Sequence, residues 1–289
     1  MREAIRLAER VAPTDSTVLI TGESGTGKNW LARFIHQKSK RNANDSVTID
    51  CAALPRELLE TELFGYEKGS FTGATEAKPG RLEAAHTGTL LLDEIALLSV
   101  EAQAKLLRVL EEREFERIGG RRTIQIDARV IATTNVDLET AVEQKTFRAD
   151  LFFRLNVVRI ELPPLRERQK DIADLAEHFL RFFAAKHARP NLKLKSEALA
   201  VLQNHDFPGN LRELANLIER AVIVTNENEI TVAAFPIFSP SNKWLTLAEL
   251  EEKHVHLTLS KTEGNKTEAA KMLGISRKNL YEKLARYQK

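Results

Sequence analysis

The strongest constraint on this chain is a glycine-rich turn between two apolar segments, in the stretch VLITGESGTGKNWLARFIH at residues 18–36. The β-branched residues before the turn predict a strand, and the apolar residues at helical spacing after it predict a helix. Glycines let backbone amides turn toward phosphate oxygens, and the N-terminus of the following helix adds its positive dipole end. The stretch therefore predicts a P-loop and an α/β fold around it.

The P-loop makes ATP the expected ligand and Mg²⁺ the expected companion ion. Lys28 is positioned to reach the β- and γ-phosphates. Asn29 departs from the usual pattern, because most P-loops carry Ser or Thr at that place to contact the metal, and an amide oxygen is a poorer ligand. The residues expected to bind the nucleotide are Gly22, Glu23, Ser24, Gly25, Thr26, Gly27, Lys28 and Asn29.

Two carboxylates end a second apolar strand, in GTLLLDEIALLS at residues 88–99. Asp93 is expected to hold the Mg²⁺ shell, with Asn29 as a weaker second ligand, and Glu94 is expected to orient and deprotonate the attacking water. Acidic pairs after strands also occur as plain helix caps. A P-loop at this distance upstream favours hydrolysis over capping.

Three further polar residues follow apolar segments. Asn135 ends the strand VIATTN, where it is suited to hold water or the γ-phosphate, although an asparagine at a strand end is often only a turn residue. Arg148 and Arg154 are six residues apart in the apolar stretch FRADLFFRLN. Arginines so placed suit either surface ion pairs or fingers presented to the nucleotide of a neighbouring subunit, and spacing alone leaves both open.

A phenylalanine interrupts a run of small residues in GSFTGA, at residues 69–74. Glycines on both sides favour an exposed loop over a helix or strand interior. Phe71 on such a loop either packs back onto its own domain or serves as a contact.

Charge is distributed unevenly along the chain. The net charge is +2, but residues 264–289 contain seven basic and two acidic side chains, so this end is +5 and the rest about −3. A basic end suits a polyanion such as DNA, although a solvated terminal helix would look similar. The single cysteine, Cys51, and the lack of a signal peptide or a long apolar run predict a cytoplasmic protein with no membrane partner.

These motifs together resemble the sigma-54-dependent transcription activators, the bacterial enhancer-binding branch of the AAA+ ATPases. The resemblance runs from about Arg2 to Lys289, and the motifs occur in the order and spacing of the family. They are GESGTGK, ELFGYEKGSFTGA, LLLDE, LLRVLEEREFERIGG, FRADLFFRLN, LPPLRER and FPGNLREL.

The resemblance implies a homo-oligomeric ring, usually a hexamer built here from dimers, with ATP at the subunit interfaces. It makes Asn135 the first nucleotide sensor and Arg212, in GNLREL, the second. Arg148 and Arg154 match the finger positions that act in trans. The family's usual GAFTGA loop is written GSFTGA here, and the resemblance assigns contact with sigma-54 to Gly69, Ser70, Phe71, Thr72, Gly73 and Ala74.

Asp50 is a second departure from the family, which often has Asn at this position to hold the catalytic Glu out of action until the partner is engaged. If Asp50 faced Glu94, two carboxylates would lie together, and one is expected to titrate high unless a proton or Mg²⁺ intervenes. The departure leaves the rate of hydrolysis open and the expected fold unchanged.

The remaining chain predicts helices. A Pro-Pro break begins a helical lid, two prolines and serines mark a linker, and a helix, a turn at Gly274 and a second helix follow. The last part resembles a Fis-type helix-turn-helix, a module that generally dimerises, or else a simple packing hairpin. Contacts with double-stranded DNA are expected from Arg277, Lys278, Asn279 and Lys283.

The predicted fold is therefore an α/β AAA+ P-loop NTPase with a parallel sheet core, an α-helical lid and a small all-α helix-turn-helix domain. The expected boundaries are 1–163, 164–235, a linker at 236–244, and 245–289. The predicted function is an ATPase that binds enhancer DNA and remodels RNA polymerase holding sigma-54 so that promoter DNA opens. The alternatives are a regulator that binds nucleotide and oligomerises without remodelling, and an AAA+ motor that acts on DNA itself.

Overall fold

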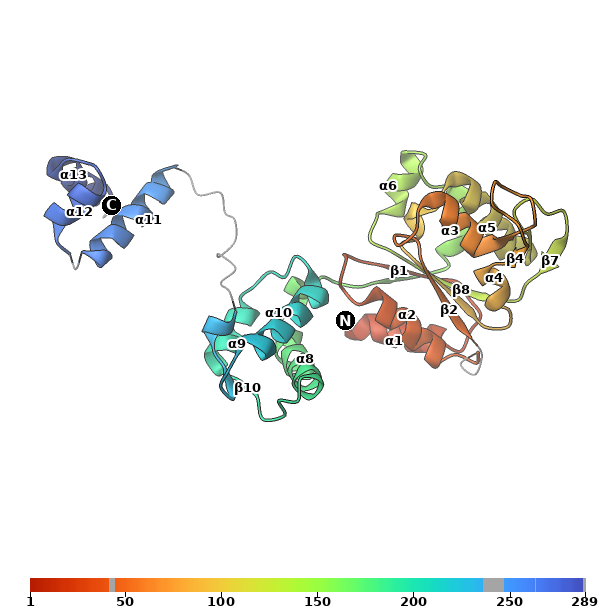
Figure 1. Ribbon diagram of the computed structural model, residues 1–289, viewed down its shortest axis with the longest axis horizontal. Coiled ribbons are helices and arrows are strands. Elements are labelled where there is room, and N and C mark those ends of the chain that lie inside the picture. Colours follow the sequence, from red (N-terminus) through yellow and green to blue (C-terminus); the bar gives the residue numbers. More distant parts are fainter. Residues whose placement is uncertain (42–44, 236–246, 263, 288–289) are drawn as a thin grey trace. The chain divides into compact units, whose positions relative to one another are not determined.

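The computed structural model describes residues 1–41, 45–235, 247–262 and 264–287 (Figure 1). The chain divides into two compact units, Met1–Ala234 and Phe235–Lys289, and each is described by itself. The predicted linker at 236–244 lies outside the described residues.

A five-stranded sheet forms the centre of the first unit. Its strand order is β2-β5-β8-β1-β9, and every neighbouring pair is parallel, as predicted from the buried apolar strands. All the strands therefore end at the same edge of the sheet, where the polar residues after them can meet. The strands are β1 (Val18–Thr21), β2 (Ser46–Asp50), β5 (Thr89–Asp93), β8 (Arg129–Thr134) and β9 (Val158–Glu161).

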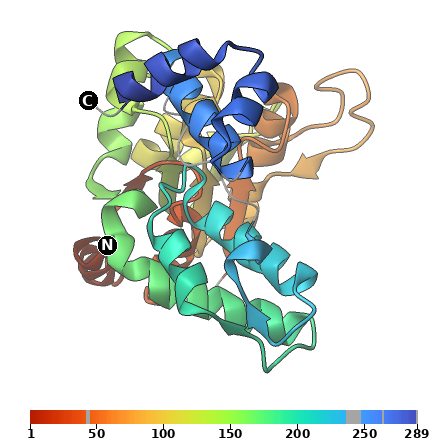
Figure 2. The same ribbon diagram turned by 90° about the vertical axis from the view of Figure 1, so that its left-hand side faces the viewer.

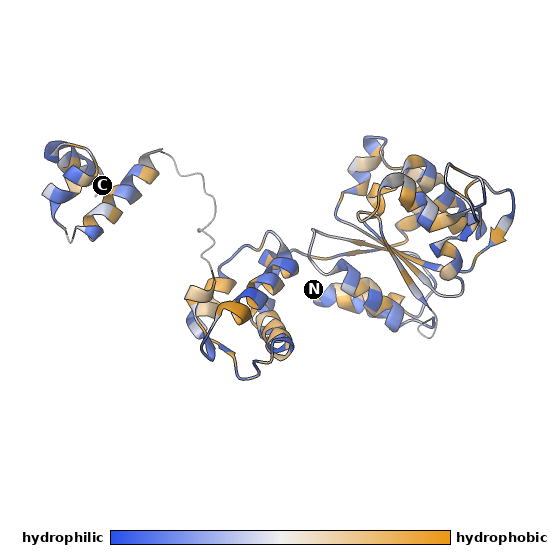
Figure 3. Cartoon of the chain, in the orientation of Figure 1, coloured by the Kyte–Doolittle hydropathy of each residue, from blue (hydrophilic) through white to orange (hydrophobic). Residues whose placement is uncertain are grey.

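Alternate side chains of the strands pack into two separate cores. In β5, Leu90 and Leu92 enter one core and Leu91 enters the other, as the period of two in a strand requires. Two helices cover the Leu91 face, α1 (Arg2–Val11) and α2 (Lys28–Gln37) (Figures 1 and 3). The opposite face is covered by α3 (Arg56–Phe64), α4 (Arg81–Ala84), α5 (Val100–Glu112), α6 (Leu138–Glu143) and α7 (Ala149–Leu155).

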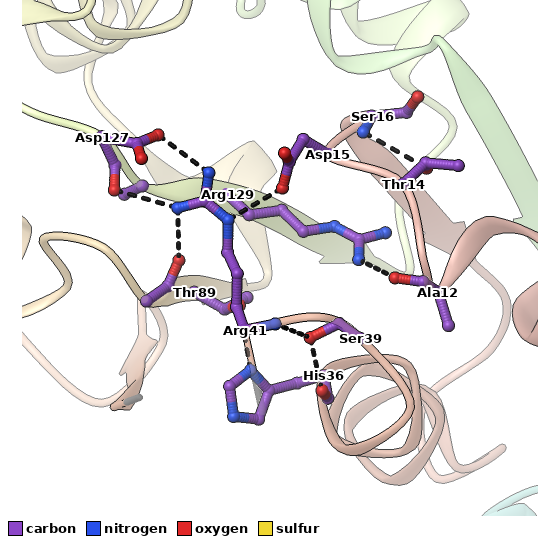
Figure 4. A network of polar contacts seen from close by, with 12 residues as sticks. Ala12, Thr14, Asp15, Ser16, His36, Ser39, Arg41, Thr89, Asp127 and Arg129 are labelled. Carbon is purple, nitrogen blue, oxygen red and sulfur yellow. Dashed lines mark hydrogen bonds and ion pairs between the residues drawn. The ribbon is translucent and has the colours of Figure 1, made fainter. Parts of the chain in front are cut away.

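A buried polar network fastens α1 and α2 to the sheet (Figure 4). The guanidinium of Arg129, 1% exposed, donates to the carbonyls of Ala12 at 2.6 Å and Val11 at 3.0 Å, which the end of α1 leaves without helical partners. On α2, His36 hydrogen bonds through Nδ1 to the hydroxyl of Thr89 at 2.9 Å. These bonds satisfy polar groups that would be costly to bury alone.

Two short antiparallel hairpins extend from the helical layer. The first pairs β3 (Gly65–Tyr66) with β4 (Lys78–Pro79), and its loop projects from the body of the unit, in light orange in Figure 2. The second pairs β6 (Glu114–Glu116) with β7 (Thr123–Gln125) and directly follows α5. A 3-10 turn, η1 (Ile95–Leu97), follows the acidic strand end.

The lid is helical, as predicted, and begins after the two prolines that follow β9. In its core α8 packs against α10, and the short strands β10 and β11 pair with each other. The elements are η2 (Leu165–Asp171), α8 (Ile172–Lys186), β10 (Lys193–Leu194), α9 (Ser196–Gln203), α10 (Asn210–Val224), β11 (Glu229–Ile230) and η3 (Val232–Ala234).

The second unit contains α11 (Leu247–Lys261), α12 (Lys266–Met272) and α13 (Arg277–Tyr287). Its small core is built around Val255, Ala269, Ala270 and Leu280. Gly274 takes a left-handed φ of 68° in the turn between α12 and α13, as the predicted helix-turn-helix requires. No helix among the described residues is long and apolar enough to cross a membrane.

Candidate active site

The P-loop connects the end of β1 to the start of α2, as the sequence predicts. Gly25 and Gly27 have left-handed φ values of 80° and 104°. A side chain at Gly25 would also collide with the backbone, since its Cβ would lie 2.4 Å from the carbonyl oxygen of Gly209. The turn therefore favours glycine at both positions, and the close approach of the lid requires it at Gly25.

Lys28 is the first residue of α2, and its side chain is almost fully buried beneath the P-loop. The ammonium donates to the carbonyls of Gly22 at 2.9 Å and Glu23 at 3.2 Å. It also lies 3.3 Å from the carboxylate of Glu94. The phosphate-binding cation and the expected water-activating base are thus in direct contact.

Glu94 follows β5 with a left-handed φ of 56°. This conformation costs a residue other than glycine roughly 1–2 kcal/mol, and such strain concentrates at functional sites. Its carboxylate also accepts a hydrogen bond of 2.9 Å from the backbone amide of Asn135. Among the hydrogen bonds of the described residues, Asn135 thus contacts the acid pair through its backbone amide and not through its side chain.

Asp93 accepts hydrogen bonds at both carboxylate oxygens. The side-chain amide of Asn29 donates to one oxygen at 2.6 Å, and the hydroxyl of Thr133 donates to the other. Asn29 thus presents its nitrogen, not its oxygen, to Asp93. A hard carboxylate oxygen beside a phosphate site fits Mg²⁺, which is commonly held by one or two carboxylates and the substrate phosphates.

Asp50 ends β2 directly opposite Asp93 in the sheet. Its carboxylate accepts a hydrogen bond of 2.9 Å from the amide of Ala52. Glu94 binds Lys28 and the amide of Asn135, so each of the two carboxylates has a partner of its own among the described residues. Burial raises the pKa of the Cys51 thiol to about 12, and the carboxylates of Asp50, Asp93 and Glu94 add to this increase.

These residues enclose a cleft of about 220 Å³ at the carboxyl ends of the strands. Residues from three parts of the predicted site line this cleft: the P-loop, the acid pair and the lid. The lining residues are Ser24, Gly25, Gly27, Lys28, Asn29, Asp93, Glu94 and Arg212.

The lid contributes more to this cleft than the sequence predicts. Arg212 donates to the Ser24 hydroxyl at 3.1 Å, as its expected position beside the nucleotide requires. Asn210 is fully buried, and its side-chain amide donates to the Ser24 carbonyl at 3.0 Å and the Glu23 carboxylate at 3.1 Å. Its side-chain oxygen accepts from the amide of Leu165 at 2.7 Å. One asparagine therefore joins the start of the lid, at Leu165, to α10 and to the P-loop.

Two further lid arginines contact the P-loop. Arg166 forms a two-pronged ion pair with Glu23, with distances of 2.6 and 2.9 Å, and these hydrogen bonds lower the pKa of Glu23 to about 2. Arg168 is buried and donates to the carbonyl of Thr26 at 3.0 Å. Arg166 and Arg168 lie in the motif LPPLRER, and Asn210 lies in FPGNLREL. The sequence therefore contains the signal for these residues, but among them and Arg212 it predicts a role for Arg212 only.

The two candidate finger arginines lie outside the cleft of their own chain. Arg148 pairs with Asp150 at 2.7 Å, and Arg154 donates to the carbonyl of Leu110 at 2.9 Å, near the end of α5. In this chain Arg148 thus makes the surface ion pair that the sequence left open. Neither residue lines the cleft.

The GSFTGA loop forms the tip of the β3–β4 hairpin. The ring of Phe71 is 44% exposed and lies edge-on against Tyr66, with 5.0 Å between ring centroids. Both sequence alternatives are therefore partly realised, because the ring contacts its own hairpin yet still presents much of its surface. Thr72 is exposed, and Ala74 is buried.

Three of the four predicted DNA contacts lie together at the start of α13. Arg277, Lys278 and Asn279 are all exposed. Lys283 differs from this expectation, because its ammonium pairs with Glu251 of α11 at 2.6 Å and is only partly exposed. The pair holds α13 against α11 within the unit.

Family models match the whole architecture in order. A sigma-54 interaction domain matches residues 1–161, an AAA+ ATPase lid domain matches residues 166–243, and a bacterial regulatory protein domain of the Fis family matches residues 246–287. The chain belongs to the family of sigma-54-dependent transcription regulators. The AAA+ fold with a helical lid and a Fis-type helix-turn-helix, predicted from the sequence, is thereby confirmed.

Relatives of this family align along nearly the entire chain. The regulatory protein AtoC of Escherichia coli is 45% identical over 99% of this chain and 66% of its own length. The transcriptional regulatory protein ZraR of Salmonella typhimurium is 47% identical over 99% of this chain and 67% of its own. The chain thus spans about two thirds of these relatives.

Solved structures of a further regulator share the fold. NtrX from Brucella abortus, crystallised in complex with ATP, is 38% identical and superimposes with a TM-score of 0.75, covering 99% of this chain and 67% of its own. The same protein in complex with ADP gives a TM-score of 0.77 at 36% identity, with the same coverage.

Proposed function

We propose that this chain is an ATP-hydrolysing activator that is tethered to DNA and remodels RNA polymerase holding sigma-54. The supporting observation is that one unit contains both a phosphate cleft with Lys28 and Glu94 in contact and a hairpin that exposes Phe71 and Thr72. A nucleotide cleft alone would suit many proteins. The exposed GSFTGA loop on the same unit supports the proposal that this unit contacts and remodels sigma-54.

ATP is the proposed substrate, by similarity to NtrX and from the P-loop. Lys28 now donates to two carbonyls and contacts Glu94. Phosphate oxygens carry full charge and accept stronger hydrogen bonds than carbonyls do, so a bound triphosphate would take over the ammonium. Glu94 would then be released from Lys28 while the amide of Asn135 still holds it.

A released Glu94 is suited to accept the proton of the attacking water. Mg²⁺ held by Asp93 would neutralise charge on the phosphates. Asn29, now bonded to Asp93, would either keep this bond or turn its oxygen to the ion. Arg212, from the lid, would sense whether the phosphates are present.

The site needs a second copy of the chain to be complete. Arg148 and Arg154 do not line their own cleft, and a finger supplied in trans would stabilise the charge of the transition state. We propose a homo-oligomeric ring, a hexamer built from dimers, with ATP at each interface. Arg154 would leave the Leu110 carbonyl to reach its neighbour.

The route from nucleotide to loop runs through α3. Between the end of β2 and Gly65, where the first hairpin begins, the chain forms α3, a helix of nine residues and about 13 Å. Movement at the carboxyl ends of the strands would therefore reach Phe71 as a shift of this helix. The helix-turn-helix would hold the ring near the promoter through Arg277, Lys278 and Asn279.

Opening of a sigma-54 promoter tests this function. Holoenzyme is mixed with promoter DNA and the chain, and unpaired thymines are detected by permanganate. We expect unpaired thymines with ATP and none with a non-hydrolysable analogue. Turnover of ATP without promoter opening, or equal opening with ATP and with the analogue, would contradict the proposal.

A second candidate is a regulator that binds nucleotide and oligomerises without remodelling. The observation in its favour is that Asn29 occupies one oxygen of Asp93. ATP turnover measured in the presence of sigma-54 distinguishes the two, since the second candidate predicts none above background.

A further inference from the structure

The tips of the two hairpins lie against each other. The amide of Glu67 on the first hairpin donates to the carbonyl of Ile118 on the second at 3.0 Å. A methyl group on Gly119 would lie 2.6 Å from Cβ of Ser70, and one on Gly120 would lie 3.1 Å from Cγ of Glu67. The two tips thus form one surface, and glycines permit this close contact.

Three basic side chains project from this surface. Lys68 follows Glu67, and Arg121 and Arg122 follow Gly120, so the contact of Glu67 with Gly120 brings them together. All three are exposed, and within the described part of the chain they have no ion pair or hydrogen bond.

The other charges of this region are mostly paired. Arg117 contacts Glu67 at 3.1 Å and Glu83 at 2.8 Å, and its hydrogen bonds lower the pKa of Glu83, with a smaller contribution from the charge of Arg122. Glu76, on the first hairpin, is exposed and offsets one positive charge. The unpaired groups at the tips are therefore predominantly positive.

We propose that Lys68, Arg121 and Arg122 form a binding site for the phosphate backbone of duplex DNA, separate from the helix-turn-helix. Exposed lysine and arginine side chains are the usual phosphate contacts, and an arginine fork matches phosphate geometry. The proposal rests on the proposed function only for identifying this DNA as promoter DNA.

The surroundings of the arginines favour DNA over an acidic protein surface. Protein interfaces need a buried apolar centre, but Arg121 and Arg122 have Gly120 and Thr123 beside them. The two isoleucines of the second hairpin, Ile118 and Ile124, pack toward the core. Lys68, Arg121 and Arg122 thus add exposed positive charge beside Phe71, the exposed apolar side chain of this surface, and such charge suits a polyanion, for which most of the affinity comes from counterion release.

The test measures binding of a fluorescent 30-base-pair duplex of random sequence by anisotropy, from 50 to 200 mM salt. All samples are the full chain carrying Arg277→Ala and Lys278→Ala, so that the helix-turn-helix contributes little. The test variant adds Arg121→Ala and Arg122→Ala. The matched control adds Arg33→Ala and Lys40→Ala, which remove the same charge from exposed positions on and after α2.

We expect about tenfold weaker binding for the test variant at the lowest salt, and a logarithmic salt slope smaller by about two, as for two lost phosphate contacts. The control is expected to bind like its parent. An equal loss in both variants, or a test variant with the parental slope, would overturn the proposal.

A parallel measurement separates DNA from protein as the ligand. If the test variant bound duplex normally but lost affinity for sigma-54, the basic surface would serve a protein and the proposal would be wrong. ATP turnover of the same samples is recorded as well, because its loss would bear on the proposed function and not on this site.

Discussion

The ammonium of Lys28 lies 3.3 Å from the carboxylate of Glu94, so the cation that binds phosphate and the acid proposed to activate water neutralise each other. Both side chains are largely buried, where an opposite charge is needed to offset the loss of water. In the proposed function a triphosphate would compete for Lys28 and so free Glu94. Substrate binding and activation of the base would then be linked through one contact.

Changing either partner should separate binding from hydrolysis. Glu94→Gln keeps the shape of the side chain and leaves Lys28 available, so we expect nucleotide binding to persist while turnover falls by about 100-fold or more. Lys28→Ala is expected to abolish nucleotide binding. Binding of a fluorescent ATP analogue and release of phosphate report the two steps. Normal turnover in Glu94→Gln would show that another group activates the water.

The Asn210 contacts should contribute strongly to stability. Asn210→Ala leaves the Leu165 amide without its partner and places alanine at a φ of 52°, so we expect the free energy of unfolding to fall by about 2–4 kcal/mol. Urea denaturation followed by circular dichroism measures this change. Asn204→Ala is the matched control, because Asn204 is exposed and, among the described residues, its side chain bonds only to Ala200. Equal effects of the two substitutions would contradict the proposed contribution of the Asn210 hydrogen bonds to stability.

Glu23 should make stability depend on acid pH. Hydrogen bonds from Arg166 and Asn210 lower the pKa of Glu23 from 4.5 to about 2 in the folded chain. The folded state therefore favours the carboxylate, and the stabilisation is complete above pH 4.5 and is lost as the pH falls toward 2. We expect the stability gap between the parent and Glu23→Gln to shrink over this range. A gap that stays constant with pH would contradict the ion pair.

Arg154 should act on a neighbouring subunit. A pure Arg154→Ala ring lacks the finger, and a pure Glu94→Ala ring lacks the base. In a mixed ring some interfaces pair an intact Arg154 with an intact Glu94, so we expect partial recovery of ATP turnover on mixing. Size-exclusion chromatography verifies that the mixtures assemble. Assembled mixtures no more active than the pure variants would place the function of Arg154 within its own chain.

The sequence predicted the residues of the cleft better than it predicted the contacts of the lid with the P-loop. Asp93 and Lys28 follow from local patterns, because a parallel sheet brings the ends of its strands to one edge. Asn210 and Arg166 act through contacts about 140 to 190 residues away in the chain, and no local periodicity encodes such partners. The motifs that contain these two residues are evident in the sequence, but the partners of their side chains are not.

Side-chain direction accounts for the other differences. Helical spacing placed Lys283 on the DNA-reading helix, but the direction of its ammonium depends on Glu251 of α11. Glycines around Phe71 correctly indicated an exposed loop, while the contact with Tyr66 depends on how the hairpin closes. For Asp50, the structure supplies both the register beside Asp93 and the bond of its carboxylate to the amide of Ala52.

The GSFTGA loop provides the most direct test of the account. Thr72 is exposed, and within the described part of the chain its hydroxyl makes no hydrogen bond, whereas Phe71 also contacts Tyr66. Thr72→Ala is therefore the cleaner substitution. Thr75→Ala is its matched control, since Thr75 is exposed on the same hairpin just beyond the loop.

The decisive measurement is the binding of sigma-54 to each variant in the presence of a transition-state analogue of ATP, together with the rate of promoter opening. We expect Thr72→Ala to assemble and hydrolyse ATP nearly as the parent does, yet to lose both sigma-54 binding and opening, while Thr75→Ala retains them. A Thr72→Ala chain that bound sigma-54 and opened the promoter at the parental rate would contradict the remodelling role of this loop.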